Sequence, residues 1–474
     1  MSALRHVHLI AIGGTGMGSL AGLLKARGLE VTGSDQNVYP PMSTALERWN
    51  IPVKRGYRAE HVLDRRPDLV VIGNAVRPDN PEARTAIDHG LPYLSFPDAL
   101  YQLAIRGKHA VVVTGTHGKT TATSLIAALL FATGRDPSFL VGGIALDFDG
   151  SFREGQGKHF VVEGDEYDTA FFDKTPKFLH YGAQTLLVTS VEFDHADIYR
   201  DLDHVKSAFR RLVLQMPADG TIIAALGSEH VRDIVVDAPC RVVGYGAVGP
   251  EFVGWRASAI TAGPHGTGFD VGREGTMIAR ARCPLFGRYN VENVLGALVV
   301  LDTLGVPVEE AVAALPAFRG IKRRQEVRGE RRGVTVIDDF AHHPTAVRAS
   351  IQAVRARFPD RRLIAVFEPR SNTSRRAVFQ EDYARSFDGA HHVVVPVVPD
   401  MPIYSATGEV TEKFSSERLA GDLGEQQLSA VALDGADAII AHLVETCEPG
   451  DVVLIMSNGP FDNIWERLLE ALAG

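Results

Sequence analysis

The sequence is poor in cysteine and has no long apolar run. Its three cysteines, Cys240, Cys283 and Cys447, are far apart and form no C-x-x-C pair. Such sparse cysteine favours a reducing compartment and argues against a structural zinc site. No segment approaches the ~20 apolar residues of a membrane-spanning helix, and the N-terminal apolar run is too short for a signal peptide. We therefore expect a cytoplasmic protein without a membrane partner.

The chain also lacks an excess of positive charge. Its 49 lysines and arginines are outnumbered by 58 aspartates and glutamates, which gives a net charge of −9. This balance disfavours a general nucleic-acid binder. Of the 474 residues, 45% are hydrophobic and 23% charged, a composition typical of a globular protein. A chain of this length predicts roughly two to four domains.

One glycine is missing from the most informative stretch, 114–121, which reads Thr-Gly-Thr-His-Gly-Lys-Thr-Thr. A complete P-loop has a further glycine where Val113 stands. The stretch still lies between a predicted strand, 110–113, and a predicted helix, 122–133. In that setting the backbone N–H groups face an anion, the lysine reaches the β- and γ-phosphates, and the threonine hydroxyl can bind Mg²⁺. A nucleoside triphosphate site is therefore predicted at Gly115, Thr116, His117, Gly118, Lys119, Thr120 and Thr121; a tight turn with a surface lysine is the alternative.

Alternating strands and helices divide the chain into three predicted α/β domains, 1–107, 108–320 and 321–474. The first has strands at 6–12, 30–33, 69–72 and 91–95 and a helix at 19–27. The second has strands at 110–113, 160–163, 185–191 and 221–225, a Gly-rich antiparallel stretch at 244–287 and a helix at 291–304. The third has strands at 334–338, 363–367, 392–396 and 451–456 and a closing helix at 463–472. Such alternation predicts parallel sheets.

A glycine-rich turn follows the first predicted strand. It comprises Gly14, Thr15, Gly16, Met17 and Gly18, and the next strand ends with Ser34 and Asp35. The turn resembles a dinucleotide-binding fingerprint, in which Asp35 bonds a ribose hydroxyl. Because any diphosphate satisfies a helix N-terminus equally well, the turn predicts a nucleotide or sugar nucleotide rather than NAD specifically. A packing turn with an ordinary aspartate is the alternative.

Acidic residues cluster after two strands of the predicted central domain. The stretch 163–168 holds four carboxylates, which repel one another unless a cation lies among them. Mg²⁺ bound to nucleotide phosphates suits them, and a solvated acidic loop is the alternative. His195 follows the next strand between Asp194 and Asp197, where it can ligate a second metal or orient a phosphate. Since the carboxyl ends of parallel strands meet at one edge, we expect these groups to gather there.

Two further pairs of candidate residues begin a helix or end a strand. Asn290 and Asn293 open a helix, which they can cap, or they can contact an adenine edge. Asp339 and His343 follow a strand, where they suit ribose, phosphate or general-base roles. For the second pair, a polar surface loop is the alternative.

Arginines supply the remaining candidates. Arg370, followed by Ser371 and Asn372, ends a strand and can bind a carboxylate of an acceptor substrate. Arg324 lies in a basic junction and can neutralise the charge of a transferring phosphate.

Together and in this order, these motifs resemble those of the Mur ligase family, ATP-dependent enzymes that form amide bonds in bacterial cell-wall synthesis. The resemblance covers essentially the whole chain, and the family's own P-loop has the short Gly-Thr-x-Gly-Lys-Thr-Thr form. It implies a Rossmann-like first domain that binds a UDP-sugar, a central P-loop ATPase domain and a Rossmann-like C-terminal domain. The site residues it implies are the Mg²⁺ ligands Thr120, Glu163 and His195, the adenine contact Asn290, the phosphate contact Arg324 and the nucleotide contact Asp339.

Within the family, the stretches 33–44, 192–198, 368–373 and 456–459 are most similar to members that attach a recycled tripeptide, L-Ala-γ-D-Glu-meso-diaminopimelate, to UDP-N-acetylmuramate. This resemblance implies that ATP phosphorylates the donor carboxylate and that the tripeptide amine attacks the acyl phosphate. The implied catalytic residues are Lys119, Glu163, His195 and Arg324. The implied cofactors are ATP and Mg²⁺, and a monomer or weak homodimer is expected.

Other hypotheses stay open at this point. An enzyme that adds L-alanine to the same donor shares the nucleotide apparatus. An NAD(P)-dependent oxidoreductase would use the first glycine turn, and a non-catalytic nucleotide-binding regulator would use the P-loop alone. Two positions also depart from the family pattern: Tyr289 replaces a usual histidine, and Arg210 stands where some members carry a carbamylated lysine. Arg210 either supplies positive charge or has a structural role.

Overall fold

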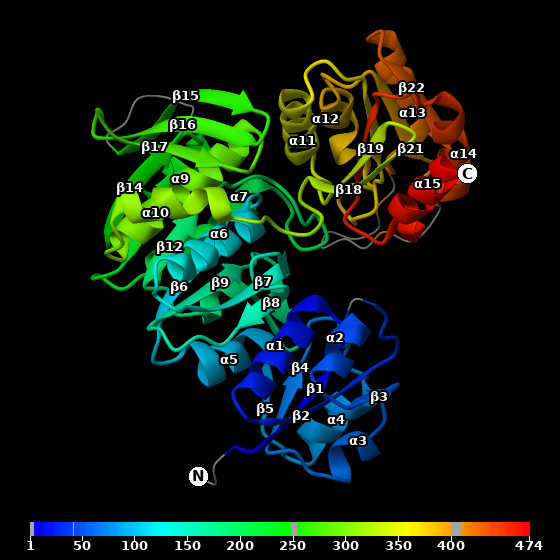
Figure 1. Cartoon of the computed structure of the whole chain (residues 1–474). Coiled ribbons are helices and arrows are strands. Elements are labelled where there is room, and N and C mark those ends of the chain that lie inside the picture. The colour runs from blue at the N-terminus through cyan, green and yellow to red at the C-terminus, as the bar shows by residue number, and fades with distance from the viewer. Residues whose placement is uncertain (1–3, 41, 248–253, 400–402, 404–409, 411) are drawn as a thin grey trace.

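Three large sheets, each covered by helices, form the frame of the protein. The computed structural model describes residues 4–40, 42–247, 254–399, 403, 410 and 412–474. Within these residues the sheets follow one another along the chain (Figure 1). A small β10–β11 hairpin is separate from them. The mixed α/β class with a parallel sheet in each part is confirmed. Pro41, in the stretch 33–44, and residues 248–253, in the stretch 244–287, lie outside the described residues.

The N-terminal sheet is parallel, with strand order β3-β2-β1-β4-β5. Its order reverses between β1 and β4, so the glycine turn after β1 lies at a switch point, where open α/β sheets bind ligands. β4 is a continuous apolar run and is buried throughout, as expected for a strand with helices on both faces. The elements are β1 (His6–Ile10), α1 (Thr15–Ala26), β2 (Glu30–Asp35), α2 (Met42–Arg48), β3 (Val53–Arg55), α3 (Glu60–Leu63), β4 (Leu69–Ile72), α4 (Pro81–Asp88), β5 (Tyr93–Ser95), α5 (Phe96–Leu100) and η1 (Tyr101–Ile105).

The central sheet has the order β17-β16-β15-β14-β13-β12-β6-β9-β7-β8. Strands from β15 to β7 are parallel, while β8, β16 and β17 run antiparallel to their neighbours. The elements are β6 (His109–Thr114), α6 (Lys119–Ala132), β7 (Ser138–Ala145), β8 (Gly150–Arg153), β9 (His159–Gly164), β10 (Asp168–Ala170), β11 (Asp173–Pro176), η2 (Lys177–His180), β12 (Thr185–Val188), α7 (Leu202–Leu214), β13 (Thr221–Ala225), α8 (Glu229–Val235), β14 (Arg241–Gly246), β15 (Trp255–Gly263), β16 (Gly266–Arg273), β17 (Thr276–Cys283), α9 (Arg288–Thr303), α10 (Val308–Ala314) and η3 (Leu315–Ala317).

The C-terminal sheet has the order β18-β19-β23-β20-β21-β22 and is parallel except for β18. The elements are β18 (Glu326–Arg331), β19 (Val334–Asp339), α11 (Pro344–Arg357), β20 (Leu363–Phe367), η4 (Ala377–Phe379), α12 (Gln380–Ala384), β21 (His392–Pro396), α13 (Ser416–Glu425), β22 (Ser429–Leu433), α14 (Gly435–Thr446), β23 (Val452–Met456), η5 (Phe461–Asn463) and α15 (Ile464–Ala473). In Figure 1 the C-terminal part lies beside the upper half of the central part, and the N-terminal part lies below the central part.

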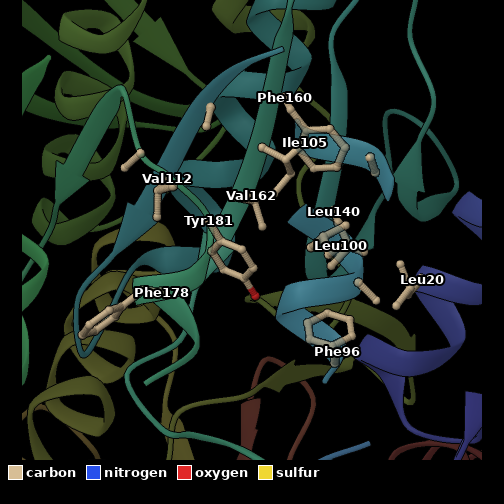
Figure 2. Close-up of a cluster of buried hydrophobic side chains, with 14 of the residues drawn as sticks. Leu20, Phe96, Leu100, Ile105, Val112, Leu140, Phe160, Val162, Phe178 and Tyr181 are labelled. Atoms are coloured by element: carbon tan, nitrogen blue, oxygen red, sulfur yellow. The ribbon is translucent and has the colours of Figure 1, made fainter. Parts of the chain in front are cut away.

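The N-terminal and central parts share one hydrophobic core. Leu20 of α1 and Phe96 of α5 belong to the same buried cluster as Phe160 and Tyr181 (Figure 2). The Ser19 and Ser151 hydroxyls are 2.6 Å apart across this junction. The glycine turn is therefore held firmly against the central sheet.

The structure corrects three expectations about element limits. Helix α1 begins at Thr15 rather than at residue 19, and α6 begins at Lys119 rather than at 122, because the glycine-rich segments pass directly into the first helical turns. Strand β12 ends at Val188 rather than at 191, because the next two residues turn toward the P-loop. The antiparallel strands predicted in 244–287 are β15, β16 and β17, and they extend the central sheet.

Among the described residues, no helix is long and apolar enough to cross a membrane.

Candidate active site

The P-loop leaves β6 and enters α6 through a tightly enclosed turn. Gly115 and Gly118 have φ angles of 138° and 81°, a region that favours glycine. A Cβ atom at Gly115 would overlap Thr189, and one at Gly118 would overlap Asn293. The Ser190 hydroxyl accepts a hydrogen bond from the His117 backbone N–H at 2.9 Å. Thr189 and Ser190, which the sequence did not single out, thus fix the conformation of the loop.

Lys119 forms a buried ion pair with Glu166. Its ammonium lies 2.7 Å from the Glu166 carboxylate and 2.7 Å from the Gly115 carbonyl oxygen. The other Glu166 oxygen lies 3.3 Å from Nε2 of His195. Burial alone would raise the pKa of Glu166, but Lys119 and His195 outweigh burial and lower this pKa to about 2. Glu166 is therefore the anionic centre of the site, although the acidic stretch 163–168 does not distinguish it from its neighbours in sequence.

Thr120, Glu163 and Arg324 converge at the start of α6. The Thr120 hydroxyl donates to Glu163 at 2.8 Å, and the Arg324 guanidinium lies 3.3 Å from the same hydroxyl oxygen. The Gly142 N–H also donates to Glu163, at 2.7 Å. Burial and the nearby Asp165 raise the pKa of Glu163, so this carboxylate lacks sufficient positive charge around it. A hydroxyl and a carboxylate are hard oxygen donors and fit Mg²⁺ bound to nucleotide phosphates.

His195 lies at a strained backbone position next to these groups. Its φ angle is 52°, and its ring lies 5.3 Å from the ring of Tyr167. Burial would lower the pKa of His195, but Asp194 and Glu166 raise it to about 9. The ring is thus an imidazolium near neutral pH in this structure, and binding a metal would require loss of its proton.

A hydrogen-bonded cluster joins the P-loop to the C-terminal part. Glu192 lies 3.4 Å from His117 Nε2 and 3.6 Å from His343 Nδ1, and it accepts a hydrogen bond from Thr345 at 2.6 Å. The three acidic and imidazole side chains place their ligand atoms within 4.8 Å of one another, a spacing that a metal ion could also use. His343 is buried and lies 3.1 Å from the Phe193 carbonyl oxygen. The cluster fixes the C-terminal part next to the predicted nucleotide site.

The predicted nucleotide-contacting amides and Asp339 already have protein partners. Asn290 donates to the Phe286 carbonyl oxygen at 2.8 Å and accepts from Asn293 at 3.2 Å. Asp339 accepts from the backbone N–H groups of Gln325 and Ala341 at 2.9 and 2.8 Å. Neither asparagine caps α9, whose N-cap position is Gly287 and has no side-chain cap hydrogen bond. Asp339 and His343 are buried, so they do not form a polar surface loop. The contact of Asn293 with the P-loop glycine places the asparagine pair beside the predicted nucleotide site.

The predicted donor-binding residues lie in the N-terminal part. Thr15, Gly16, Met17 and Gly18 form the first turn of α1, and Gly14 precedes it in an extended conformation. Asp35 accepts a hydrogen bond from the Gly13 N–H at 2.8 Å and so braces the turn. Ser34 instead donates to the fully buried Glu82. The first-turn N–H groups remain the part of this set best suited to a diphosphate.

The predicted acceptor-binding residues lie after β20. Arg370 is half exposed and lies 3.8 Å from Glu368, with its stem against Gly459. Ser371 donates to Ser374 at 2.9 Å, and Asn372 lies 3.4 Å from Arg375. Arg370 is thus available to a ligand, whereas Ser371 and Asn372 mainly order their own loop.

A cavity of about 450 Å³ lies next to Glu166. Asp197, Tyr199, His204 and Arg211 contribute to its wall. It provides space for a charged substrate beside the Lys119–Glu166 pair.

Comparison with known proteins identifies the family. Residues 6–108 match the Mur ligase family catalytic domain, residues 113–301 the Mur ligase middle domain, and residues 323–459 the Mur ligase glutamate ligase domain. The chain belongs to the Mur ligase family. This Mur ligase is therefore an ATP-dependent enzyme that forms amide bonds, and the family assignment favours the ligase hypothesis over the oxidoreductase and regulator hypotheses.

Named relatives cover the whole length of this Mur ligase. UDP-N-acetylmuramate–L-alanyl-γ-D-glutamyl-meso-2,6-diaminoheptandioate ligase from Escherichia coli K12 is 38% identical over 477 residues, 98% of each chain. UDP-N-acetylmuramate–L-alanine ligase from Salinibacter ruber is 35% identical over 474 residues, 100% of this chain and 96% of its own. The crystal structure of a murein peptide ligase from Psychrobacter arcticus has a TM-score of 0.74 and 35% identity and covers 99% of both chains.

Both positions that depart from the Mur ligase pattern have structural partners. The Tyr289 hydroxyl is hydrogen-bonded to Gln325, which links α9 to the C-terminal part. Arg210 lies 2.8 Å from Asp233 of α8, and Lys206 lies 3.1 Å from the same carboxylate. Arg210 therefore stabilises the contact between α7 and α8, which favours the structural alternative.

Most arginines of the basic junction, residues 322–332, form ion pairs or hydrogen bonds within the protein. Arg323 lies 3.3 Å from Asp338 and donates to the Ser457 carbonyl oxygen at 2.7 Å. Arg328 pairs with Glu466, and Arg332 donates to carbonyl oxygens near the end of α14. Arg324 differs from them because it faces Thr120 of the P-loop.

Proposed function

We propose that this Mur ligase joins L-Ala-γ-D-Glu-meso-diaminopimelate to UDP-N-acetylmuramate and cleaves ATP to ADP and phosphate. The main support is the 38% identity, over 98% of both chains, to the Escherichia coli ligase whose name states that donor and acceptor. The Psychrobacter murein peptide ligase, 35% identical over 99% of both chains, supports the same choice. The reaction belongs to cell-wall peptide recycling.

Formation of an amide from a carboxylate requires activation, because a carboxylate is a poor electrophile. We propose that the γ-phosphoryl group of ATP is transferred to the donor carboxylate, which forms an acyl phosphate. This transfer needs positioning and charge neutralisation more than a protein nucleophile. Lys119 and Arg324 supply positive charge at the two sides of Thr120. Thr120, Glu163 and His195 would hold Mg²⁺, which supplies further charge neutralisation on the phosphates.

The acceptor amine then attacks the acyl carbon, and phosphate leaves. Water must be kept out, because it would hydrolyse the acyl phosphate. The contacts of Glu192 with His343 and Thr345 hold the C-terminal part over the P-loop and support this role. Arg370, on the same part, is placed to bind an acceptor carboxylate as a fork.

We propose that residues 1–107 bind the UDP-sugar, 108–320 bind ATP and 321–474 bind the acceptor. Because ATP is a cytoplasmic substrate, we place the reaction in the cytoplasm. A monomer or weak homodimer remains the proposed state, and sedimentation velocity would measure it.

A panel of acceptors tests the function. Purified protein with ATP, Mg²⁺ and UDP-N-acetylmuramate is offered the tripeptide, L-alanine or a longer peptide, and the products are read by mass spectrometry and ADP release. The tripeptide should give the highest kcat/KM. Turnover with L-alanine equal to that with the tripeptide would assign the chain to the L-alanine ligases, and ADP release without the donor would refute a ligase of this type.

A further inference from the structure

Lys177 is a largely buried cation beside Asp165. It begins η2, and only 10% of its side chain is exposed. Its nearest carboxylate oxygen, on Asp165, lies at 3.6 Å, beyond hydrogen-bonding distance. Its ammonium lies 3.9 Å from the centre of the Tyr167 ring and 5.6 Å from that of Phe96. Among the residues that the structure describes, none accepts a hydrogen bond from this ammonium.

The backbone holds Lys177 in this position. Its N–H donates to the Tyr167 carbonyl oxygen at 3.2 Å, and the next N–H, of Phe178, donates to the Asp165 carbonyl oxygen at 3.1 Å. The Phe178 ring is buried in the core shared with the N-terminal part (Figure 2). Because Asp165 lies near the outer limit of an ion pair, the buried ammonium keeps the capacity to bind a further anionic group.

The surroundings of Lys177 connect the glycine turn with the metal-binding side chains. Phe96 lies 3.6 Å from the place of a Cβ atom on Gly16, in the first turn of α1. On the other side, the Tyr167 ring lies 5.3 Å from the ring of His195. Lys177 contacts both aromatic rings, so it lies between the predicted diphosphate site and the site of phosphoryl transfer.

A sugar nucleotide that reaches from the glycine turn to His195 passes this point with two anionic groups, its diphosphate and its carboxylate. We propose that the Lys177 ammonium binds one of these oxyanions of UDP-N-acetylmuramate and so helps to position the donor carboxylate for phosphorylation. This role rests on the proposed function. The rings of Tyr167 and Phe96 favour the charged ammonium from the other directions.

Binding measurements without ATP test this role. UDP, UDP-N-acetylglucosamine and UDP-N-acetylmuramate are titrated by calorimetry into wild type, Lys177→Gln and Lys177→Arg. A hydrogen-bonded charged pair contributes about 1.5–3 kcal/mol, so Lys177→Gln should weaken UDP-N-acetylmuramate binding about 10- to 100-fold. Lys177→Arg should restore part of it. Weaker binding of all three ligands identifies the diphosphate as the partner, and weaker binding of UDP-N-acetylmuramate alone identifies the carboxylate.

Lys206→Gln is the matched control, because Lys206 is similarly buried, with 13% of its side chain exposed, and pairs with Asp233. It should leave all three affinities unchanged. If Lys177→Gln is poorly folded, Lys177→Gln with Asp165→Asn removes the uncompensated carboxylate, and Asp165→Asn alone is its reference. Unchanged affinities in a folded Lys177 variant would overturn the role and leave Lys177 as a counter-ion of Asp165. Failure of wild type to bind UDP-N-acetylmuramate would refute the proposed function as well.

Discussion

Replacing Lys119 with methionine should separate the catalytic and structural effects of one ammonium. The Lys119 ammonium lies 2.7 Å from Glu166, and 11% and 3% of the two side chains are exposed. In the proposed reaction the same ammonium contacts the phosphates of ATP. We therefore expect Lys119→Met to abolish turnover and also to destabilise the ligand-free protein.

The loss of folding stability in Lys119→Met follows from the lowered pKa of Glu166. The pKa of Glu166 in the folded protein, about 2, lies below its ordinary value of 4.5. One pKa unit corresponds to about 1.4 kcal/mol, so its partners favour the ionised form by about 3 kcal/mol. Lys119 is the largest favourable cause of this shift. Leaving a buried charge without its partner typically costs about 3–5 kcal/mol. For a domain of roughly 150–250 residues this corresponds to a fall in Tm on the order of 10 °C.

The double variant Lys119→Met with Glu166→Gln supplies the discriminating measurement. Removing the carboxylate that has lost Lys119 should restore most of the lost Tm, while ADP release stays absent because the ammonium proposed to bind the phosphates is still missing. Differential scanning calorimetry and coupled ADP detection measure the two effects. The reasoning is refuted by wild-type-like turnover in either variant, or by a double variant that melts as low as Lys119→Met.

Three further predictions concern buried charges. Glu163→Gln should lose ATP turnover but keep or raise its Tm in EDTA, because burial raises the pKa of Glu163 and the neutral amide avoids an uncompensated charge; a large fall in Tm would contradict this. The pKa of His195 rises to about 9 from an ordinary value of 6.5, so its contribution to stability is complete below pH 6.5 and disappears as the pH rises through 9. Urea unfolding between these pH values should show this decline in wild type and a smaller one in His195→Gln. Glu82→Ala should cost about 3–5 kcal/mol, because the fully buried carboxylate lies 3.2 Å from His8 and 2.5 Å from His61; thermal melting of Glu82→Gln, which keeps one of the two oxygen acceptors, should show a smaller loss.

Local patterns were sufficient to predict most strands and the fold class. β4, β13, β20 and β21 have the predicted limits, because each is an apolar run bounded by turn residues or charged residues. The family resemblance is confirmed by matches along the chain. The assignments of individual site residues and the domain limits remain predictions, although the structure brings Thr120, Glu163 and Arg324 together.

Helix starts were less predictable than strands. The residues at the N-termini of α1 and α6 are glycines and threonines, which usually favour turns. Here their N–H groups point along the helix axis toward the predicted phosphate sites, so the helical conformation extends into the glycine motifs. Helix propensity alone therefore predicts both helix starts too late in the sequence.

From the sequence of this Mur ligase one can predict which segments form buried strands. The sequence also shows that a short P-loop, a predicted sugar-nucleotide turn and an arginine-bearing third part occur in one chain. These features depend on residues close in sequence, so local chemistry specifies them. The partners of these groups, in contrast, depend on how distant segments pack in three dimensions. Glu166 faces Lys119 across 47 positions, Thr345 bonds to Glu192 across 153, and the Lys177 ammonium lies near the rings of Tyr167 and Phe96. Such pairings depend on strand order and on the docking of separate sheets, and neither is written in any single stretch of residues.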